Sequence, residues 1–269
     1  MPTSSDFPFV PRTTKYQPEN AYSLGQAANL AYAGAPDVQR TTAKWGFQKF
    51  KFFDRADTQA YAIGNDETIV VAFRGTEPKD LHDWLTDAEF DLVDGPFGKV
   101  HDGFYRALHQ VWRDVYATIL EFQDKAQSLW FAGHSLGAAL AALAVATLRA
   151  EHDKPVYGLY TFGQPRTGDR DFEKGFDQDF ESQCFRFVNN NDIVTRVPLR
   201  VMGYSHVGTF LYFDDKGKIQ EDPSWWYRFL DGVKGDLENL GKMLPDQLAD
   251  HSMDRYVALL QKNIKNNPF

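Results

Sequence analysis

The chain has 269 residues, of which 43% are hydrophobic and 15% aromatic, a composition typical of a globular protein and not of a disordered chain. Its formal net charge of −8 argues against nucleic acid as a partner, since phosphates need a basic surface, and against docking on anionic membranes by charge alone. With Cys184 as the single cysteine, an internal disulfide is excluded, and we expect this thiol to be buried and structural.

No apolar stretch behind a basic start is present in the first twenty residues, so we expect no secretory signal in this sequence. The longest uncharged apolar run, 136–148, is too short to span a bilayer. The chain is therefore expected to be soluble, either cytoplasmic or secreted with a signal removed. Its oligomeric state is left open.

The predicted elements alternate between strands and helices. Residues 1–20 are rich in proline and are expected to form an extended arm on a single domain at 21–269. Apolar periodicity predicts helices over 22–32, over 104–122, from residue 136 onward, and at the C-terminal end. Runs of β-branched and aromatic residues predict strands at 45–53, 58–63, 68–73, 128–132, 156–162, 184–188 and 207–213. This alternation predicts an α/β fold with a mostly parallel sheet, antiparallel in part near the N-terminus.

One segment, 130–140, carries the strongest chemical signal: Trp-Phe-Ala-Gly-His-Ser-Leu-Gly-Ala-Ala-Leu. A short apolar strand, Gly-x-Ser-x-Gly and a run of helix formers predict that Ser135 lies on a sharp turn as an exposed nucleophile. Gly133 and Gly137 are expected where a Cβ would collide with neighbouring backbone. The alternative is an ordinary strand–helix turn with an N-capping serine.

A serine nucleophile needs a base and an orienting acid, which in this pattern follow in the order Ser, Asp or Glu, His. His152 lies at the far end of the helix after Ser135, and His206 directly precedes a predicted strand, so His251 in a late loop is the favoured base. Asp192 follows the strand at 184–188, at the sheet edge where sites in open α/β sheets form, and is the favoured acid. The alternative for Asp192 is a loop residue that caps the next turn.

Five motifs in order along the chain resemble the class 3, or fungal-type, triacylglycerol lipases of the α/β-hydrolase superfamily. The resemblance extends over about residues 20–262, and these motifs lie at 71–76, 100–104, 133–137, 161–168 and 189–198.

The resemblance implies an α/β-hydrolase fold in which Ser135 is the nucleophile, Asp192 the acid and His251 the base. It also implies an oxyanion hole formed by Thr76 and the backbone N–H of Leu136, although Thr76 alternatively caps the helix that follows it. This chemistry needs neither a metal nor another cofactor.

After His206, the chain departs from the family. Thr209, Phe210 and Tyr212 replace the acidic residues and Trp usual there, so we interpret His206 as structural. The disulfides of secreted fungal members are also absent, which makes the chain look closer to bacterial or intracellular relatives.

Residues 77–90 directly follow the predicted oxyanion position. Leu81, Trp84 and Leu85 share one face of an expected amphipathic helix whose other faces are polar. This resembles the family's lid, which covers the site in water and moves at a lipid surface. The alternative is a fixed surface helix whose apolar face belongs to the core.

A second amphipathic stretch, about 225–244, precedes His251. We expect it to pack against the core; contact of Trp225 and Trp226 with lipid is the alternative.

These patterns favour hydrolysis of carboxylic esters through an acyl-enzyme, with an acylglycerol at an oil–water interface as the substrate. The alternatives are a feruloyl or aryl esterase, a phospholipase A1, or a catalytically silent scaffold of the same fold. Motif spacing reports neither acyl-chain length nor regiospecificity.

Overall fold

The computed structural model describes residues 6–77, 80–81, 90–190, 192–220 and 249–266. Within this part, eight strands form one twisted sheet in the order β1-β2-β3-β6-β7-β8-β9-β10. The strands are β1 (Lys49–Arg55), β2 (Thr58–Gly64), β3 (Thr68–Phe73), β6 (Ser128–His134), β7 (Gly158–Phe162), β8 (Cys184–Asn189), β9 (Thr209–Phe213) and β10 (Ile219–Gln220).

The pairing of these strands confirms the mostly parallel sheet. β3, β6, β7, β8 and β9 run parallel to one another, whereas β1, β2 and β3 form an antiparallel meander at the N-terminal side. The short β10 adds an antiparallel strand at the opposite edge. A separate two-stranded ribbon joins β4 (Leu92–Asp94) to β5 (Lys99–His101).

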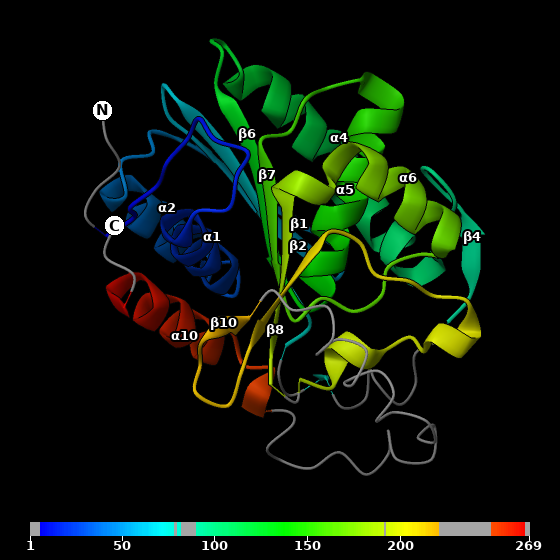
Figure 1. Cartoon of the computed structure of the whole chain (residues 1–269). Helices are drawn as coiled ribbons and strands as arrows, with labels where there is room; N and C mark the ends of the chain where they lie inside the picture. Colours follow the sequence, from blue (N-terminus) through cyan, green and yellow to red (C-terminus); the bar gives the residue numbers. More distant parts are fainter. Residues whose placement is uncertain (1–5, 78–79, 82–89, 191, 221–248, 267–269) are drawn as a thin grey trace.

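Helices cover both faces of the sheet (Figure 1). On one face lie α1 (Pro18–Leu30), α2 (Ala35–Lys44) and α10 (Met253–Asn266); on the other lie α4 (Asp102–Phe122), α5 (Leu136–His152) and α6 (Arg170–Phe180). Three short 3-10 turns are η1 (Glu181–Gln183), η2 (Val194–Arg196) and η3 (Arg200–Met202). None of the helices in the described part is both long and apolar enough to cross a membrane.

The central strand β6 shows how the sequence specifies two cores. Its side chains alternate between the faces, so Leu129 and Phe131 pack with α4 and α5 while Trp130 and Ala132 pack with α1 and α10. Because both faces are covered, β6 is apolar throughout its centre and is buried along its whole length.

α5 is a core helix, as its uniformly apolar sequence predicts. Every residue from position 137 to position 148 is buried, because the helix lies between the sheet and α4. Cys184 at the start of β8 is fully buried, as predicted, and this burial raises the pKa of its thiol.

The N-terminal region differs from its prediction. α1 begins at Pro18, inside the stretch expected to be an extended arm, because proline suits the first turn of a helix. The residues before it still run over the sheet's α1 face, where Phe7 is fully buried and its ring stacks on Trp45 at 4.7 Å.

Two helices are absent from the sequence prediction. α2 ends at Lys44, so the strand expected over 45–53 begins only at Lys49. α2 is short and mostly polar, with few apolar residues to mark a period. α6 did carry a signal: Asp169 caps its first turn, and buried phenylalanines recur every four residues, at positions 172, 176 and 180.

Candidate active site

Ser135 lies on the turn between β6 and α5 in a conformation that few side chains adopt, with φ 57° and ψ −130°. Its backbone N–H donates to the carbonyl of Phe162 at 3.0 Å, which fixes the turn to the end of β7. A Cβ at Gly133 would collide with the Gly137 carbonyl, and one at Gly137 with the Phe73 carbonyl. Both glycines are therefore required by close backbone approach, as predicted.

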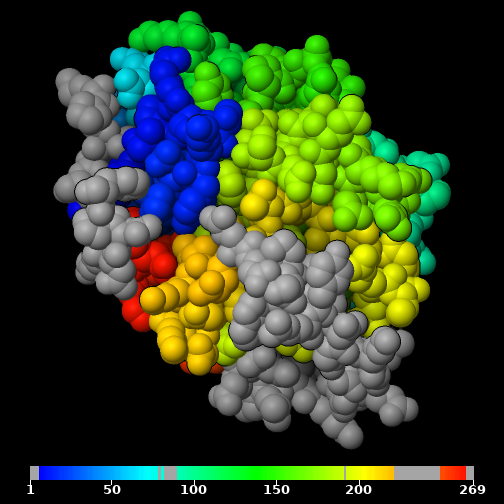
Figure 2. Space-filling model, viewed as in Figure 1, coloured from blue at the N-terminus to red at the C-terminus, as the bar shows by residue number. Residues whose placement is uncertain are grey.

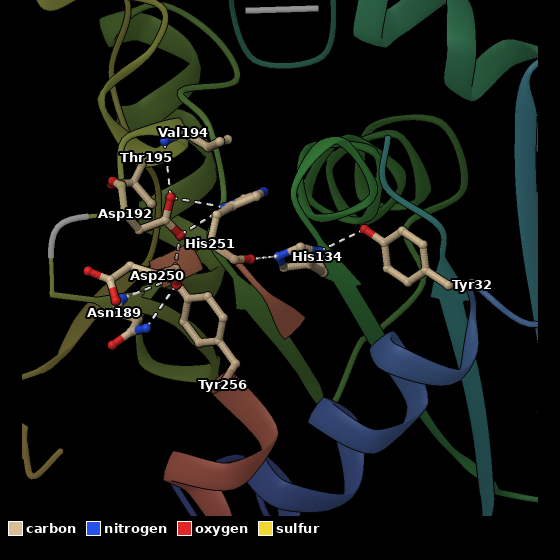
Figure 3. A network of polar contacts seen from close by, with 9 residues as sticks. All are labelled: Tyr32, His134, Asn189, Asp192, Val194, Thr195, Asp250, His251 and Tyr256. Carbon is tan, nitrogen blue, oxygen red and sulfur yellow. Dashed lines mark hydrogen bonds and ion pairs between the residues drawn. The ribbon is translucent and has the colours of Figure 1, made fainter. Parts of the chain in front are cut away.

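Asp192 and His251 come from loops after β8 and before α10, and the fold brings them into direct contact (Figure 3). Nδ1 of His251 lies 2.9 Å from each carboxylate oxygen of Asp192. Asp192 is fully buried and His251 is nearly so. Since the carboxylate accepts, Nδ1 carries the proton, and Nε2 is left with a lone pair for another donor.

Ser135 Oγ and the second ring nitrogen of His251, Nε2, are both buried, and neither has a hydrogen-bond partner among the described residues. They are the two atoms that a serine–histidine pair would use. His134, which directly precedes Ser135, packs its ring on His251 with centroids 4.4 Å apart, so the elbow and the histidine loop are neighbours. Catalytic hydrogen bonds are often long before substrate binds.

A polar network surrounds the Asp192 carboxylate (Figure 3). Oδ1 accepts from the backbone N–H of Val194 at 3.0 Å, and Oδ2 accepts from the Tyr256 hydroxyl at 2.6 Å. The Tyr256 hydroxyl oxygen in turn accepts from the backbone N–H of Asn189 at 2.9 Å. The side-chain amide of Asn189 donates to the backbone carbonyl of Asp250 at 2.8 Å. The network therefore joins the end of β8, the histidine loop and α10.

A second network ties the histidine loop to the elbow. His134 Nε2 donates to the backbone carbonyl of His251 at 2.7 Å, which leaves Nδ1 to accept from the Tyr32 hydroxyl at 2.7 Å (Figure 3). Burial, followed by the neighbouring His251, lowers the pKa of His134 well below its usual range. His134 is accordingly neutral, and its two ring nitrogens join the turn after α1 and the histidine loop to the end of β6.

Thr76 lies in the segment after β3, beside the elbow. A Cβ at Gly75 would approach the Ser135 Cβ to 2.9 Å, so this segment runs directly against the serine. Thr76 and His251 both line a cavity of about 300 Å³. Leu136 is the first residue of α5, where a backbone N–H has no acceptor within the helix.

Only one of the three expected lid residues is described. Leu81 is buried and lines the same cavity as Thr76 and His251. Trp84 and Leu85 lie outside the described residues, as do Trp225 and Trp226 of the second amphipathic stretch.

Two of the other histidines, His206 and His152, make contacts that do not involve Ser135, Asp192 or His251 side chains. His206 is buried, and its Nε2 donates to the Thr195 carbonyl at 2.9 Å, in keeping with a structural role, while His152 stacks on Tyr116. The described residues contain no group of three or more His, Cys, Asp or Glu side chains arranged to hold a metal ion.

Three residues of the site were missed by sequence reasoning: Tyr32, His134 and Tyr256. His134 carried a signal, since it adjoins Ser135 inside the glycine motif and a histidine is an unusual choice for a buried turn. Tyr32 and Tyr256 carried none, because a tyrosine near a helix end most often serves packing.

A mostly parallel sheet covered by helices, with a serine on a strained strand–helix turn and a buried His–Asp pair beside it, defines an α/β-hydrolase. Similarity to known proteins narrows this class. The sequence profile of the family "Lipase (class 3)" matches residues 70–202.

A secreted mono- and diacylglycerol lipase of Fusarium solani is 30% identical over 244 residues, covering 84% of this chain and 68% of the relative. A triacylglycerol lipase of Arabidopsis thaliana is 30% identical over 73% of this chain, which spans only 50% of the plant protein. The solved triacylglyceride lipase of Rhizomucor miehei superposes with a TM-score of 0.63 at 27% identity, covering 74% of this chain and 80% of that one. The chain belongs to the class 3 lipase family.

Proposed function

We propose that this protein hydrolyses carboxylic esters of acylglycerols through an acyl-enzyme on Ser135. Membership of the class 3 lipase family and the names of the relatives, which act on mono-, di- or triacylglycerols, support this substrate class. The observation that carries the chemistry is the His251–Asp192 pair at 2.9 Å, with His251 Nε2 unpartnered among the described residues next to the serine turn.

In the proposed acylation, His251 Nε2 takes the proton of Ser135 as Oγ attacks the ester carbonyl carbon. Asp192 holds the ring through Nδ1 and stabilises the imidazolium that forms. The carbonyl oxygen becomes negative and is stabilised by the N–H of Leu136 and by Thr76; such donors are typically worth about 3 to 4 kcal/mol each. His251 then protonates the departing alcohol of the glycerol.

Deacylation repeats these steps with water. His251 removes a proton from the water, which attacks the acyl carbon, and Ser135 leaves as its Oγ regains the proton from His251. The free fatty acid is released. The whole reaction consumes one ester bond and one water molecule and releases one fatty acid and one alcohol, so atoms and charges balance.

We further assign positioning roles to Tyr256 and His134. Tyr256 donates to Asp192 Oδ2, the oxygen that also faces His251, and it thereby orients the carboxylate. His134 fixes the backbone of His251 relative to the Ser135 turn. Neither side chain reacts in this scheme. Both keep the reacting groups aligned, and the rate enhancement from proximity depends on that alignment.

The test is the initial rate on the short-chain triacylglycerol tributyrin, below and above its solubility limit, with Ser135→Ala as the matched control. We expect ester hydrolysis that Ser135→Ala abolishes, with a higher rate once droplets appear. Smooth saturation below the limit, also abolished by the mutation, would indicate an esterase that does not require an interface.

Absence of any Ser135-dependent hydrolysis of tributyrin would overturn the acylglycerol assignment. Feruloyl esters and phospholipids would then be the substrates to measure. Ser135-independent hydrolysis would overturn the acyl-enzyme itself.

A further inference from the structure

A second cavity, of about 310 Å³, is lined by residues of α6, β8 and the stretch that leads into β9. In Figure 1 this yellow stretch lies near α6, and in Figure 2 their yellow and yellow-green atoms meet at the surface. Three arginines line the cavity: Arg166 and Arg186 are each only 3% exposed, whereas Arg200 is exposed. Ligand pockets begin at about 300 Å³, so a small molecule fits this space.

Arg166 is a buried cation that forms no ion pair with a carboxylate in the described part of the chain. Its Nη1 donates to two neutral acceptors, the backbone carbonyls of Arg196 and of Pro198, the latter at 2.8 Å. Burial, followed by the nearby Arg186 and Arg200, lowers the pKa of Arg166 to about 9, so its side chain is still charged at neutral pH. Because a buried charge is costly without an opposite charge beside it, an anion in the cavity would be stabilising.

Arg186 lines the same cavity from β8. Its Nε donates to the Val207 carbonyl at 3.2 Å, and its guanidinium carbon lies 5.0 Å from the centre of the Phe210 ring. These two contacts hold the guanidinium in place. Guanidinium groups bind phosphate through paired N–H donors, and three of them around one cavity favour a phosphate over a singly charged carboxylate.

Three carboxylates line the rest of the charged surface of the cavity, and all are less buried than Arg166 and Arg186. Glu173 and Asp177 of α6 are half-buried, and Glu181 of η1 is exposed. Asp177 Oδ1 accepts from the backbone N–H of Gly208 at 2.7 Å, and burial raises the pKa of Asp177 to about 6. Carboxylate oxygens accept hydrogen bonds from hydroxyl groups and repel a second anionic group. The lining therefore fits a ligand that carries one phosphate and several hydroxyls.

Side chains of this cavity also hold the loop of the catalytic acid. Arg166 binds two carbonyls of the stretch that follows Asp192. His206, which lines the cavity too, donates from Nε2 to the Thr195 carbonyl at 2.9 Å, and the Thr195 hydroxyl donates to the Asp192 carbonyl at 2.8 Å. A ligand that fixes Arg166 would thereby fix this loop.

We propose that the cavity binds a small phosphorylated polyol, with its phosphate on the arginines and its hydroxyls on the α6 carboxylates, and that occupancy steadies the loop carrying Asp192. A phosphate group is common to free metabolites and to lipid headgroups. Because the cavity is lined largely by charged and polar side chains, the free molecule is the proposed ligand. The site is separate from the ester chemistry, since neither Ser135 nor His251 lines it.

The experiment titrates the full-length protein with glycerol 3-phosphate in a calorimeter at constant ionic strength, with glycerol as the probe that lacks phosphate. Arg200→Gln removes the exposed arginine of the cavity. The matched control is Arg113→Gln, which removes an exposed arginine of α4 outside the cavity. Asp177→Asn removes a negative charge and keeps an oxygen that can accept from the N–H of Gly208.

We expect glycerol 3-phosphate to bind and glycerol not to bind. Arg200→Gln should weaken binding by about tenfold, and Arg113→Gln should leave it unchanged. Asp177→Asn should tighten binding severalfold, a gain that damage to the fold would not produce. With the ligand bound, the backbone amides of residues 193–208 should exchange hydrogen more slowly, because the phosphate holds Arg166.

Absence of glycerol 3-phosphate binding would overturn the inference, as would an equal loss in the Arg113 variant or weaker binding by Asp177→Asn. Protection confined to amides outside residues 193–208 would overturn the link to the acid loop. Binding only to vesicles that contain phosphatidic acid would overturn the free ligand in favour of a lipid headgroup. None of these results touches the proposed function, which fails instead if tributyrin is not hydrolysed in a Ser135-dependent way.

Discussion

The two halves of the candidate site are built in different ways. The serine half is one continuous segment, β6, Ser135 and α5, whose shape depends on backbone packing around Gly133 and Gly137. The acid–base half joins Asp192 to His251 across 59 positions of sequence through side-chain hydrogen bonds. Changes at the two glycines of the first half should therefore damage the fold, whereas changes in the second half should damage the chemistry and leave the fold largely intact.

Asp192→Asn should have the largest effect on activity and should break the acid–base half alone. An amide in place of the carboxylate favours the tautomer with the proton on Nε2 of His251, which then cannot accept the Ser135 proton. We expect kcat to fall by about 10⁴-fold, the size known for this change in a serine protease triad. Rates on dissolved tributyrin measure it.

Asparagine nearly matches aspartate in volume, so the melting temperature of Asp192→Asn should stay close to that of the parent. A variant that keeps a tenth of the parent kcat would remove Asp192 from the proposed mechanism.

Gly137→Ala should break the serine half through its backbone. The added methyl group would overlap the Phe73 carbonyl of β3, so the strand and the helix must separate. We expect a loss of about 3 kcal/mol or more in the free energy of unfolding, measured with denaturant.

The control for this change is Gly34→Ala, where φ is −69° and a new Cβ would meet only ordinary contacts. Its stability should change by less than about 1 kcal/mol. Similar stabilities for the two variants would mean that close backbone approach does not shape the turn.

His134 joins the two halves, and its protonation should loosen them as the pH falls. Because burial lowers the folded-state pKa of His134 below its unfolded value, the stabilisation is present above about pH 6.5 and is lost on acidification. The loss amounts to at most about 1.4 kcal/mol per pH unit. His134→Gln removes this titration, so its free energy of unfolding should fall less steeply.

Between pH 6.5 and pH 5, the decline for the parent should exceed that for His134→Gln, by at most about 2 kcal/mol. The glutamine variant should be less stable than the parent at pH 8. Parallel curves for the two proteins would contradict a neutral, buried His134 in the folded state.

Tyr256→Phe should give the smallest effect and tests fine control of the acid. Without the Tyr256 hydroxyl, Asp192 Oδ2 loses a hydrogen bond of 2.6 Å, so the carboxylate holds the His251 ring less firmly. We expect kcat on dissolved tributyrin to fall by up to about tenfold while KM stays close to that of the parent.

Tyr22→Phe is the matched control, because the Tyr22 hydroxyl accepts only an exposed bond from Gln261 in the described residues. A purely structural Tyr256 would lower stability without lowering kcat, and that outcome would end its positioning role.

The same comparison explains which parts of the fold and of the site can be predicted from the sequence. The serine turn was predictable because strand, glycines and helix are contiguous, and each leaves a local pattern. α2 was missed because it is short and polar, and β4 and β5 because three residues are too few to show a period.

For the acid–base half, the sequence predicts which two residues take part but not the contacts that hold them in place. Residue type, loop position and family resemblance selected Asp192 and His251, but the contacts of Tyr256 and Tyr32 depend on α10 and α1 packing beside the sheet. No local pattern encodes such contacts.

Covalent labelling tests the central claim most directly. The protein is treated with a p-nitrophenyl alkylphosphonate, which releases p-nitrophenol when a serine nucleophile attacks phosphorus, and the mass of intact protein and of its peptides is measured. We predict one adduct per chain, on Ser135, absent from Ser135→Ala and formed far more slowly by Asp192→Asn. An unlabelled protein, or an adduct on another residue, would contradict the account.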